Sequence, residues 1–147
     1  MNRLTPIEVL VIHDRVLQRT GGDHGIRDLG ALVSTLGRPF GGTATGDFYP
    51  TLEHKAAALC HGLVREHPFA DGNHRTGVAA AALLMERNGR RLTAAPEAMV
   101  RFTQGVAGDH HRIESMADWF REHSEPVPLK PNDRRGRPTG AKERRNA

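Results

Sequence analysis

The sequence predicts an all-α protein: one compact domain of about six helices, followed by a disordered basic tail. Apolar residues recur at intervals of three and four over about the first 120 positions, which is the periodicity of amphipathic helices. Helix start and stop signals divide this region into segments, and no segment alternates between apolar and polar residues as a half-buried strand would. The length of 147 residues fits a single domain.

Two helices are predicted before residue 38. Thr5-Pro6-Ile7-Glu8 forms a capping box with proline at the first helical position, so the first helix begins at Pro6. Thr20-Gly21-Gly22 ends it, and Gly37 and Pro39 end the second helix. The apolar stripes expected to face the core are Ile7, Leu10, Val11 and Leu17 in the first helix and Ile26, Leu29, Leu32, Val33 and Leu36 in the second.

The next two helices are separated by a short turn. Residues 38–50 carry two prolines and three glycines, which predicts an exposed loop or flap. Thr51 can cap the third helix, and His67-Pro68 ends it because the residue before proline is pushed out of the α region. The fourth helix is expected from Asn73 to Arg87, ending at Asn88-Gly89.

The last two helices are expected at residues 96–105 and 109–122. After His123 the composition changes to proline and basic residues, which cannot bury enough apolar area to offset the cost of ordering the chain. The sequence therefore predicts a folded domain over residues 1–123 and a disordered Pro/Arg-rich tail over residues 124–147.

Charge and cysteine content exclude several classes of function. Residues 130–147 hold seven basic and two acidic residues, whereas residues 1–129 carry a net charge of −1, so the domain itself is not a basic nucleic-acid-binding surface. Cys60 is the only cysteine, which excludes an internal disulfide. The longest apolar run, Val78 to Met85, is too short to span a bilayer, and the N-terminus lacks the pattern of a signal peptide. We expect a cytoplasmic protein without membrane attachment.

The chemistry is concentrated in residues 67–77, His-Pro-Phe-Ala-Asp-Gly-Asn-His-Arg-Thr-Gly. A helix N-terminus presents unpaired backbone N–H groups and attracts anions, and Gly72 lets the backbone approach a ligand closely. Arg75 can donate two hydrogen bonds to phosphate oxygens, and Asp71 is an oxygen ligand of the kind that Mg²⁺ selects. His67 can take a proton from an attacking hydroxyl. This combination favours phosphoryl or nucleotidyl transfer from a nucleotide.

The same segment resembles a known signature. Residues 67–75 are similar to the Fic/Doc motif His-x-Phe-x-Asp/Glu-Gly-Asn-Gly/Lys-Arg, and the flanking segments 4–28 and 49–69 resemble the death-on-curing (Doc) toxin branch. The similarity extends from about Leu4 through Gly89. It implies a compact all-helical Fic fold that acts on ATP and a protein hydroxyl.

The resemblance assigns roles position by position. His67 corresponds to the catalytic base and Asp71 to the Mg²⁺ ligand, and Phe69 corresponds to the aromatic residue that fixes the loop. The positions that resemble the phosphate- and nucleotide-binding segment are Gly72, Asn73, His74 and Arg75.

Two positions depart from the pattern of members that transfer AMP. Those members carry glycine where this chain has His74, and a second arginine where it has Val78. Doc-type toxins carry lysine at the former position and present the γ-phosphate instead. An imidazole can replace that cation only when protonated. The resemblance therefore favours a kinase-like phosphotransferase, with AMP transfer as one alternative and an inactive scaffold that binds an antitoxin or DNA as another.

The resemblance also implies partners. The protein substrate expected from the Doc branch is elongation factor Tu, whose modification blocks translation, and the expected inhibitor is a separate Phd-type antitoxin. In the tail, Arg135-Gly136-Arg137-Pro138 resembles the core of an AT-hook, so a weak DNA contact by residues 134–138 is a further hypothesis, with a solubilising tail as the alternative.

Overall fold

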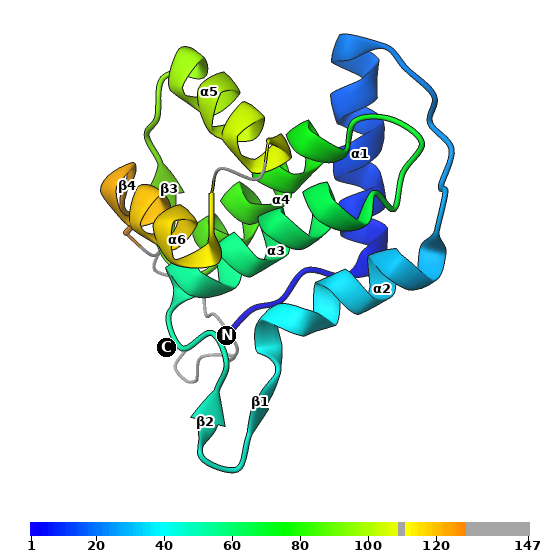
Figure 1. The fold of residues 1–147 in the computed structure, drawn as a ribbon. Helices are drawn as coiled ribbons and strands as arrows, with labels where there is room; N and C mark the ends of the chain where they lie inside the picture. Colours follow the sequence, from blue (N-terminus) through cyan, green and yellow to red (C-terminus); the bar gives the residue numbers. More distant parts are fainter. Residues whose placement is uncertain (109–110, 129–147) are drawn as a thin grey trace, which may run out of the picture.

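The computed structural model describes residues 1–108 and 111–128, and it confirms the all-α fold class. Six α-helices make up most of this part of the chain, with one short 3₁₀-helix (η1) and four strands of two or three residues (Figure 1). In chain order the elements are α1 (Pro6–Thr20), α2 (Leu29–Gly37), η1 (Arg38–Phe40), β1 (Gly42–Thr43), β2 (Gly46–Asp47), α3 (Leu52–Glu66), α4 (Asn73–Arg87), β3 (Arg90–Leu92), α5 (Pro96–Ala107), α6 (Ile113–Glu122) and β4 (Ser124–Pro126).

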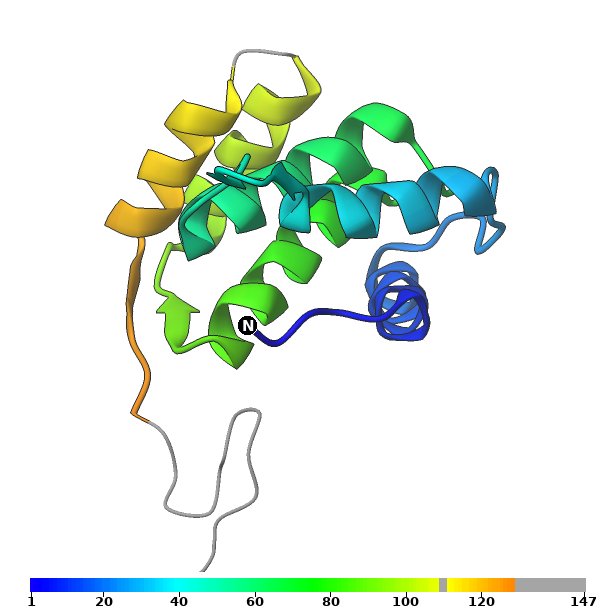
Figure 2. The same cartoon turned by 90° about the horizontal axis from the view of Figure 1, so that it is seen from below.

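The centre of the fold is the pair α3 and α4. α3 packs along α4 on one side and against α6 on another, while α1 lies against α4. α5 and α6 lie on the side of this pair away from α1, as two perpendicular views show (Figures 1 and 2). A Cβ atom on Gly77 of α4 would lie 3.1 Å from the carbonyl oxygen of Cys60, so glycine allows the two central helices to approach closely.

The starts of α1, α3 and α4 are where the sequence predicted them. The Thr5 and Thr51 hydroxyls accept hydrogen bonds from the N–H groups of Glu8 and His54, and Glu8 completes the capping box. α4 spans the predicted residues, Asn73–Arg87. α5 extends two residues beyond its predicted end. The starts of α1 and α3 therefore follow local capping chemistry.

The predicted buried face of α1 was wrong in part. Ile7 and Val11 are 71% and 45% exposed, while the buried positions are Val9, His13 and Leu17. These three residues are spaced by four and lie on one face of the helix. The apolar pattern missed this face because its central residue is a histidine.

α2 also differs from its predicted stripe. The helix begins at Leu29 because the Asp28 carboxylate accepts the N–H of Ala31 at 2.9 Å, so Ile26 precedes the helix and is exposed. Leu29 and Val33 are exposed as well, whereas Leu32 and Leu36 are buried against the core.

Two short antiparallel ribbons were not predicted, because strands of two or three residues are too short to show an alternating pattern. In the first, Gly42 and Thr43 pair with Asp47 and Gly46. The buried ammonium of Lys55 holds this β1–β2 hairpin. It donates to the Asp47 carboxylate at 3.0 Å and to the main-chain carbonyl of Tyr49.

The hairpin lies at the wrong end of α3 to act as a flap beside residues 67–75. It precedes the first turn of α3, whereas His67 follows the last turn. A helix of 15 residues is about 22 Å long, so the two regions are separated by the length of α3.

The second ribbon pairs Arg90–Leu92 with Ser124–Pro126. The predicted domain ends at residue 123, but β4 lies beyond it. β4 belongs to the folded domain because its backbone hydrogen-bonds to the segment after α4. Residues 129–147 of the predicted tail, which include residues 134–138, lie outside the described residues. None of the helices in the described part of the chain combines the length and the apolar character that a membrane span requires.

Candidate active site

The loop between α3 and α4 begins with a strained residue. His67 follows the last residue of α3 and has φ 51° and ψ 58°, in the left-handed region. Among the described residues it is the only one other than glycine with a positive φ. Pro68 cannot continue the helix, so the chain turns at His67 and leaves its side chain exposed.

Three side chains from different elements hold this loop. Both groups of the buried Asn73 amide bond to the main chain of Phe69, accepting its N–H and donating to its carbonyl, each at 3.0 Å. The buried His13 ring stacks on the Phe69 ring with centroids 3.8 Å apart, and its Nε2–H donates to the Asp71 carbonyl at 2.8 Å. Arg27 donates to the carbonyls that end α3.

The first turn of α4 has no side-chain cap. Gly72 is its N-cap and provides no side-chain hydrogen bond, in contrast to the capped helices α1, α2 and α3. The first bond of the helix runs from the Thr76 N–H to the Gly72 carbonyl, so the N–H groups of the preceding residues have no partner within the helix. Gly72 has φ 79°, and a Cβ atom there would lie 2.9 Å from Leu17 Cδ2. A larger residue at this position would therefore be strained.

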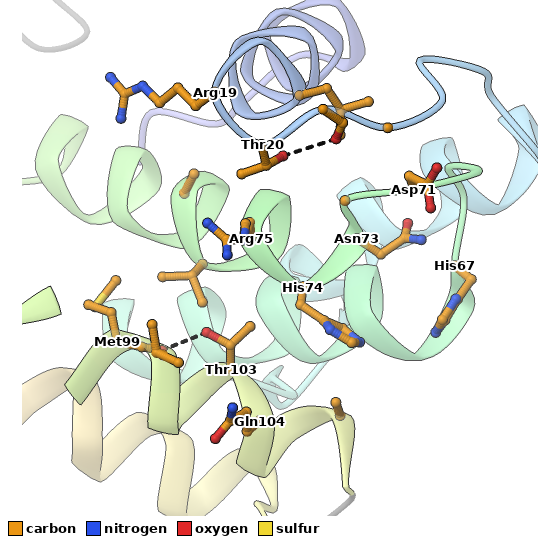
Figure 3. A pocket seen from close by; sticks show the side chains of 18 of the residues that line it. Arg19, Thr20, His67, Asp71, Asn73, His74, Arg75, Met99, Thr103 and Gln104 are labelled. Atoms are coloured by element: carbon orange, nitrogen blue, oxygen red, sulfur yellow. Dashed lines mark hydrogen bonds between the residues drawn. The ribbon is translucent and has the colours of Figure 1, made fainter. Parts of the chain in front are cut away.

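All six predicted site residues line one cavity of about 1080 Å³, which is large enough for a nucleotide. Figure 3 shows His74 and Arg75 in the first turn of α4, between the loop that carries His67 and Asp71 and the side chains of α5. The predicted residues are His67, Asp71, Gly72, Asn73, His74 and Arg75. The end of α1 and one face of α5 complete the walls, through residues that include Arg19, Thr20, Met99, Thr103 and Gln104.

The Asp71 carboxylate fits a magnesium ligand. It is exposed and lines the cavity, and one of its oxygens accepts the Asp23 N–H at 2.8 Å. A carboxylate offers about four lone-pair sites, so this bond orients the group and leaves acceptor capacity for a cation. The hydrogen bond from His13 to the Asp71 carbonyl fixes the main chain on which the carboxylate is carried.

His67 and His74 are neighbours in the cavity. Their ring centroids are 6.1 Å apart and the rings are nearly perpendicular, at 89°. Partial burial lowers the pKa of His74 from its ordinary value, and the charge of His67 lowers it further. His74 is therefore mostly neutral at pH 7 in the free protein, and it gains a cationic form only at lower pH or beside an anion.

Sequence reasoning missed the residues that support the site from a distance. His13 and Arg27 lie about 40 to 58 positions before their loop partners, so no spacing along the chain connects them to the loop. One signal was available, since His13 lies midway between Val9 and Leu17 at helical spacing. The contribution of α5 to the cavity had no sequence signal.

The comparisons with known proteins agree with the motif. The sequence profile of the Fic/DOC family matches residues 3–85. "Protein kinase doc" of Escherichia phage P1 is 31% identical over 121 residues, which cover 82% of this chain and 94% of that protein. "Toxin Doc" of Mycolicibacterium smegmatis is 43% identical over 74 residues, which cover 50% of this chain and 57% of that protein. The chain therefore belongs to the Fic/DOC family, in its Doc toxin branch.

Proposed function

We propose that this protein is a Doc-like toxin that transfers the γ-phosphate of Mg-ATP to a hydroxyl group of a target protein. The observation that carries the proposal is the uncapped N-terminus of α4, which opens into a cavity beside an exposed histidine, an exposed aspartate and an arginine. The name of the phage P1 relative, a protein kinase, supports phosphotransfer as the reaction.

In this proposal each residue has a distinct role. His67 accepts the proton of the attacking hydroxyl, whose oxygen bonds to the γ-phosphorus as the bond to the β,γ-bridging oxygen breaks and ADP leaves. Asp71 would hold Mg²⁺, which when bound offsets negative charge on the phosphate oxygens. The N–H groups at the start of α4 and the Arg75 guanidinium bind phosphate oxygens, and they stabilise charge as it develops there.

The Asn73 side chain supports the site indirectly. Its amide is 6% exposed and both of its polar groups already bond to the main chain of Phe69. In this proposal only the backbone N–H of residue 73 is available to bind phosphate. The amide side chain fixes the conformation of the loop.

Two residues favour γ-phosphate transfer over AMP transfer. The His74 side chain lines the cavity at the position where AMP-transferring members carry glycine, and it occupies space beside the first turn of α4. Val78 also lines the cavity, at the position of their second arginine, and provides no charge for a phosphate. AMP transfer and an inactive scaffold remain the competing hypotheses.

We propose elongation factor Tu as the protein substrate and a Phd-type antitoxin as the inhibitor. Both rest on the Doc resemblance and on the name of the mycobacterial relative, a toxin. The target hydroxyl has to reach the His67 ring from solvent, and this ring is exposed and lines the cavity.

The test uses ATP labelled at either the α- or the γ-phosphate, with purified elongation factor Tu and, separately, with a bacterial lysate. We expect γ-label on a protein target, abolished by His67→Ala and retained by His54→Gln, a substitution near the opposite end of α3. Transfer of α-label instead would establish AMP transfer. Absence of both labels from all targets would refute the enzymatic proposal and favour the scaffold.

A further inference from the structure

The carbonyl groups at the end of α3 are held by one residue that lies 40 positions earlier. Arg27 Nε donates to the His67 carbonyl and Nη2 donates to the Glu66 carbonyl, each at 2.6 Å. The main-chain N–H of Arg27 donates to the Pro68 carbonyl at 2.8 Å. A single arginine therefore donates hydrogen bonds to three consecutive carbonyls at the point where α3 ends and the chain turns.

The main-chain N–H groups that usually donate to the last carbonyls of a helix cannot replace Arg27 here. The last carbonyls of a helix lack intrahelical partners, and a glycine in the left-handed conformation commonly ends a helix so that the following N–H groups can satisfy them. Here the left-handed residue is His67, which carries a Cβ, and the next residue is Pro68, which has no N–H. The planar guanidinium supplies two donors in a fixed geometry, and its positive charge suits a helix C-terminus.

Arg27 is itself anchored to the fold. The segment that contains it runs antiparallel to the loop, with an isolated bridge between Ile26 and Phe69 and a hydrogen bond from the Ala70 N–H to the Gly25 carbonyl at 3.0 Å. The next residue, Asp28, caps α2. The hydrogen bonds to His67 therefore connect the start of α2 to the end of α3.

We infer that Arg27 is a positioning residue for His67. Its guanidinium holds the His67 main chain in the left-handed conformation from which the imidazole faces the cavity, and without it the base loses its fixed position relative to Asp71 and the start of α4. The inference rests on the proposed function, in which His67 accepts the proton of the attacking hydroxyl. Arg27 does not line the cavity, so it acts through His67 and not on the nucleotide.

The inference predicts a separation between turnover and nucleotide binding. In Arg27→Ala we expect kcat for γ-label transfer to fall by roughly ten- to a hundredfold, the cost of misplacing a catalytic group by a fraction of an ångström to one ångström. The Kd for Mg-ATP, measured by calorimetry, should stay within about twofold. Arg27→Lys keeps one donor and should recover part of kcat. The control is Arg15→Ala, which removes an exposed arginine of α1 outside the cavity and should change neither quantity.

Two outcomes would overturn the inference. Unchanged kcat in folded Arg27→Ala would show that His67 needs no support from Arg27, and unchanged kcat in Arg27→Lys would show that the paired donors of the guanidinium are not needed. A rise in Kd that accounts for the whole loss of activity would place the effect on nucleotide binding. Thermal melting identifies any variant that fails to fold. If Arg27→Ala fails to fold, the kcat of Arg27→Lys, the milder change, tests the inference.

The test separates this inference from the proposed function. If the wild-type protein transfers no label, the proposed function fails. The effect of Arg27 on the conformation of His67 is then measured by nuclear magnetic resonance of ¹⁵N-labelled protein. Arg27→Ala should then shift the backbone amide and imidazole resonances of His67 while those of His54 stay in place. Unshifted His67 resonances would refute the positioning by Arg27 independently of activity.

Discussion

Replacing Asn73 by alanine tests whether its side chain serves the loop or the ligand. The substitution removes two hydrogen bonds to Phe69, each contributing about 1 kcal/mol, and leaves a buried N–H and carbonyl without partners, at about 1 kcal/mol or more each. We expect a loss of about 2–4 kcal/mol in the free energy of unfolding. For a domain of this size that corresponds to a fall in Tm of roughly 10 °C.

The chain provides a matched control at the other end of the same helix. The Asn88 side chain accepts the Asn2 N–H at 2.8 Å and donates to the carbonyls of Asn2 and Leu84. Asn88→Ala should therefore lower stability by a comparable amount, measured by urea denaturation, without changing the affinity for Mg-ATP. Asn73→Ala should lower both, because the loop that precedes the open helix N-terminus is no longer fixed.

The reasoning would be refuted by a particular pair of results. If Asn73→Ala keeps the stability of the wild-type protein but loses Mg-ATP binding, its amide contacts the nucleotide directly and the two hydrogen bonds to Phe69 contribute little. If Asn88→Ala weakens nucleotide binding as strongly as Asn73→Ala, general destabilisation explains both effects.

Three further predictions concern charged and titratable groups. The hydrogen bond from Arg87 holds the pKa of Glu8 at about 2, below its ordinary 4.5, so this pair stabilises the fold above pH 4.5 and the contribution is lost as pH falls toward 2. Glu8→Gln should cost about 1 kcal/mol at pH 7, after allowance for solvent screening, and clearly less at pH 2, where about half of the Glu8 carboxyl is protonated. Denaturation at both pH values checks this, and equal losses would contradict it. Burial lowers the pKa of His74, and a bound triphosphate raises it, so Mg-ATP should bind more tightly at about pH 6 than at about pH 8. Calorimetry should find this dependence flattened in His74→Lys, and an unchanged slope would exclude His74 as its source. Lys55→Met removes the anchor of Asp47, so limited proteolysis should cut the β1–β2 hairpin faster. Nucleotide affinity should not change, and a large change would contradict the separation of hairpin and cavity along α3.

The sequence was sufficient where the determining interactions are local. Thr5 and Thr51 fix helix starts through hydrogen bonds within one turn, and Pro68 ends α3 by its covalent structure. The six predicted site residues fall within nine consecutive positions, so a single turn between two helices brings them to one cavity. Chain connectivity alone made that part of the site predictable.

Features that depend on distant contacts were not predictable in the same way. Burial of His13 instead of Ile7 depends on the stack with Phe69 and the bond to a loop carbonyl, neither of which hydropathy records. The β3–β4 ribbon joins segments more than 30 residues apart, and α5 reaches the cavity through its packing on α3 and α4. The role of Arg27 likewise becomes visible only when the loop and the start of α2 are seen together.

The pairing of β3 with β4 determines where the C-terminal segment leaves the domain. The Val127 N–H donates to the Gly89 carbonyl at 2.8 Å, just past the last turn of α4, while the first turn of α4 lines the cavity. Because α4 is about 22 Å long, an affinity tag or fluorophore attached after residue 128 begins about a full helix length from the first turn of α4. Attachment at that point is therefore suited to measurements of ligand binding, whereas a label on residue 22, which lines the cavity, would interfere with them.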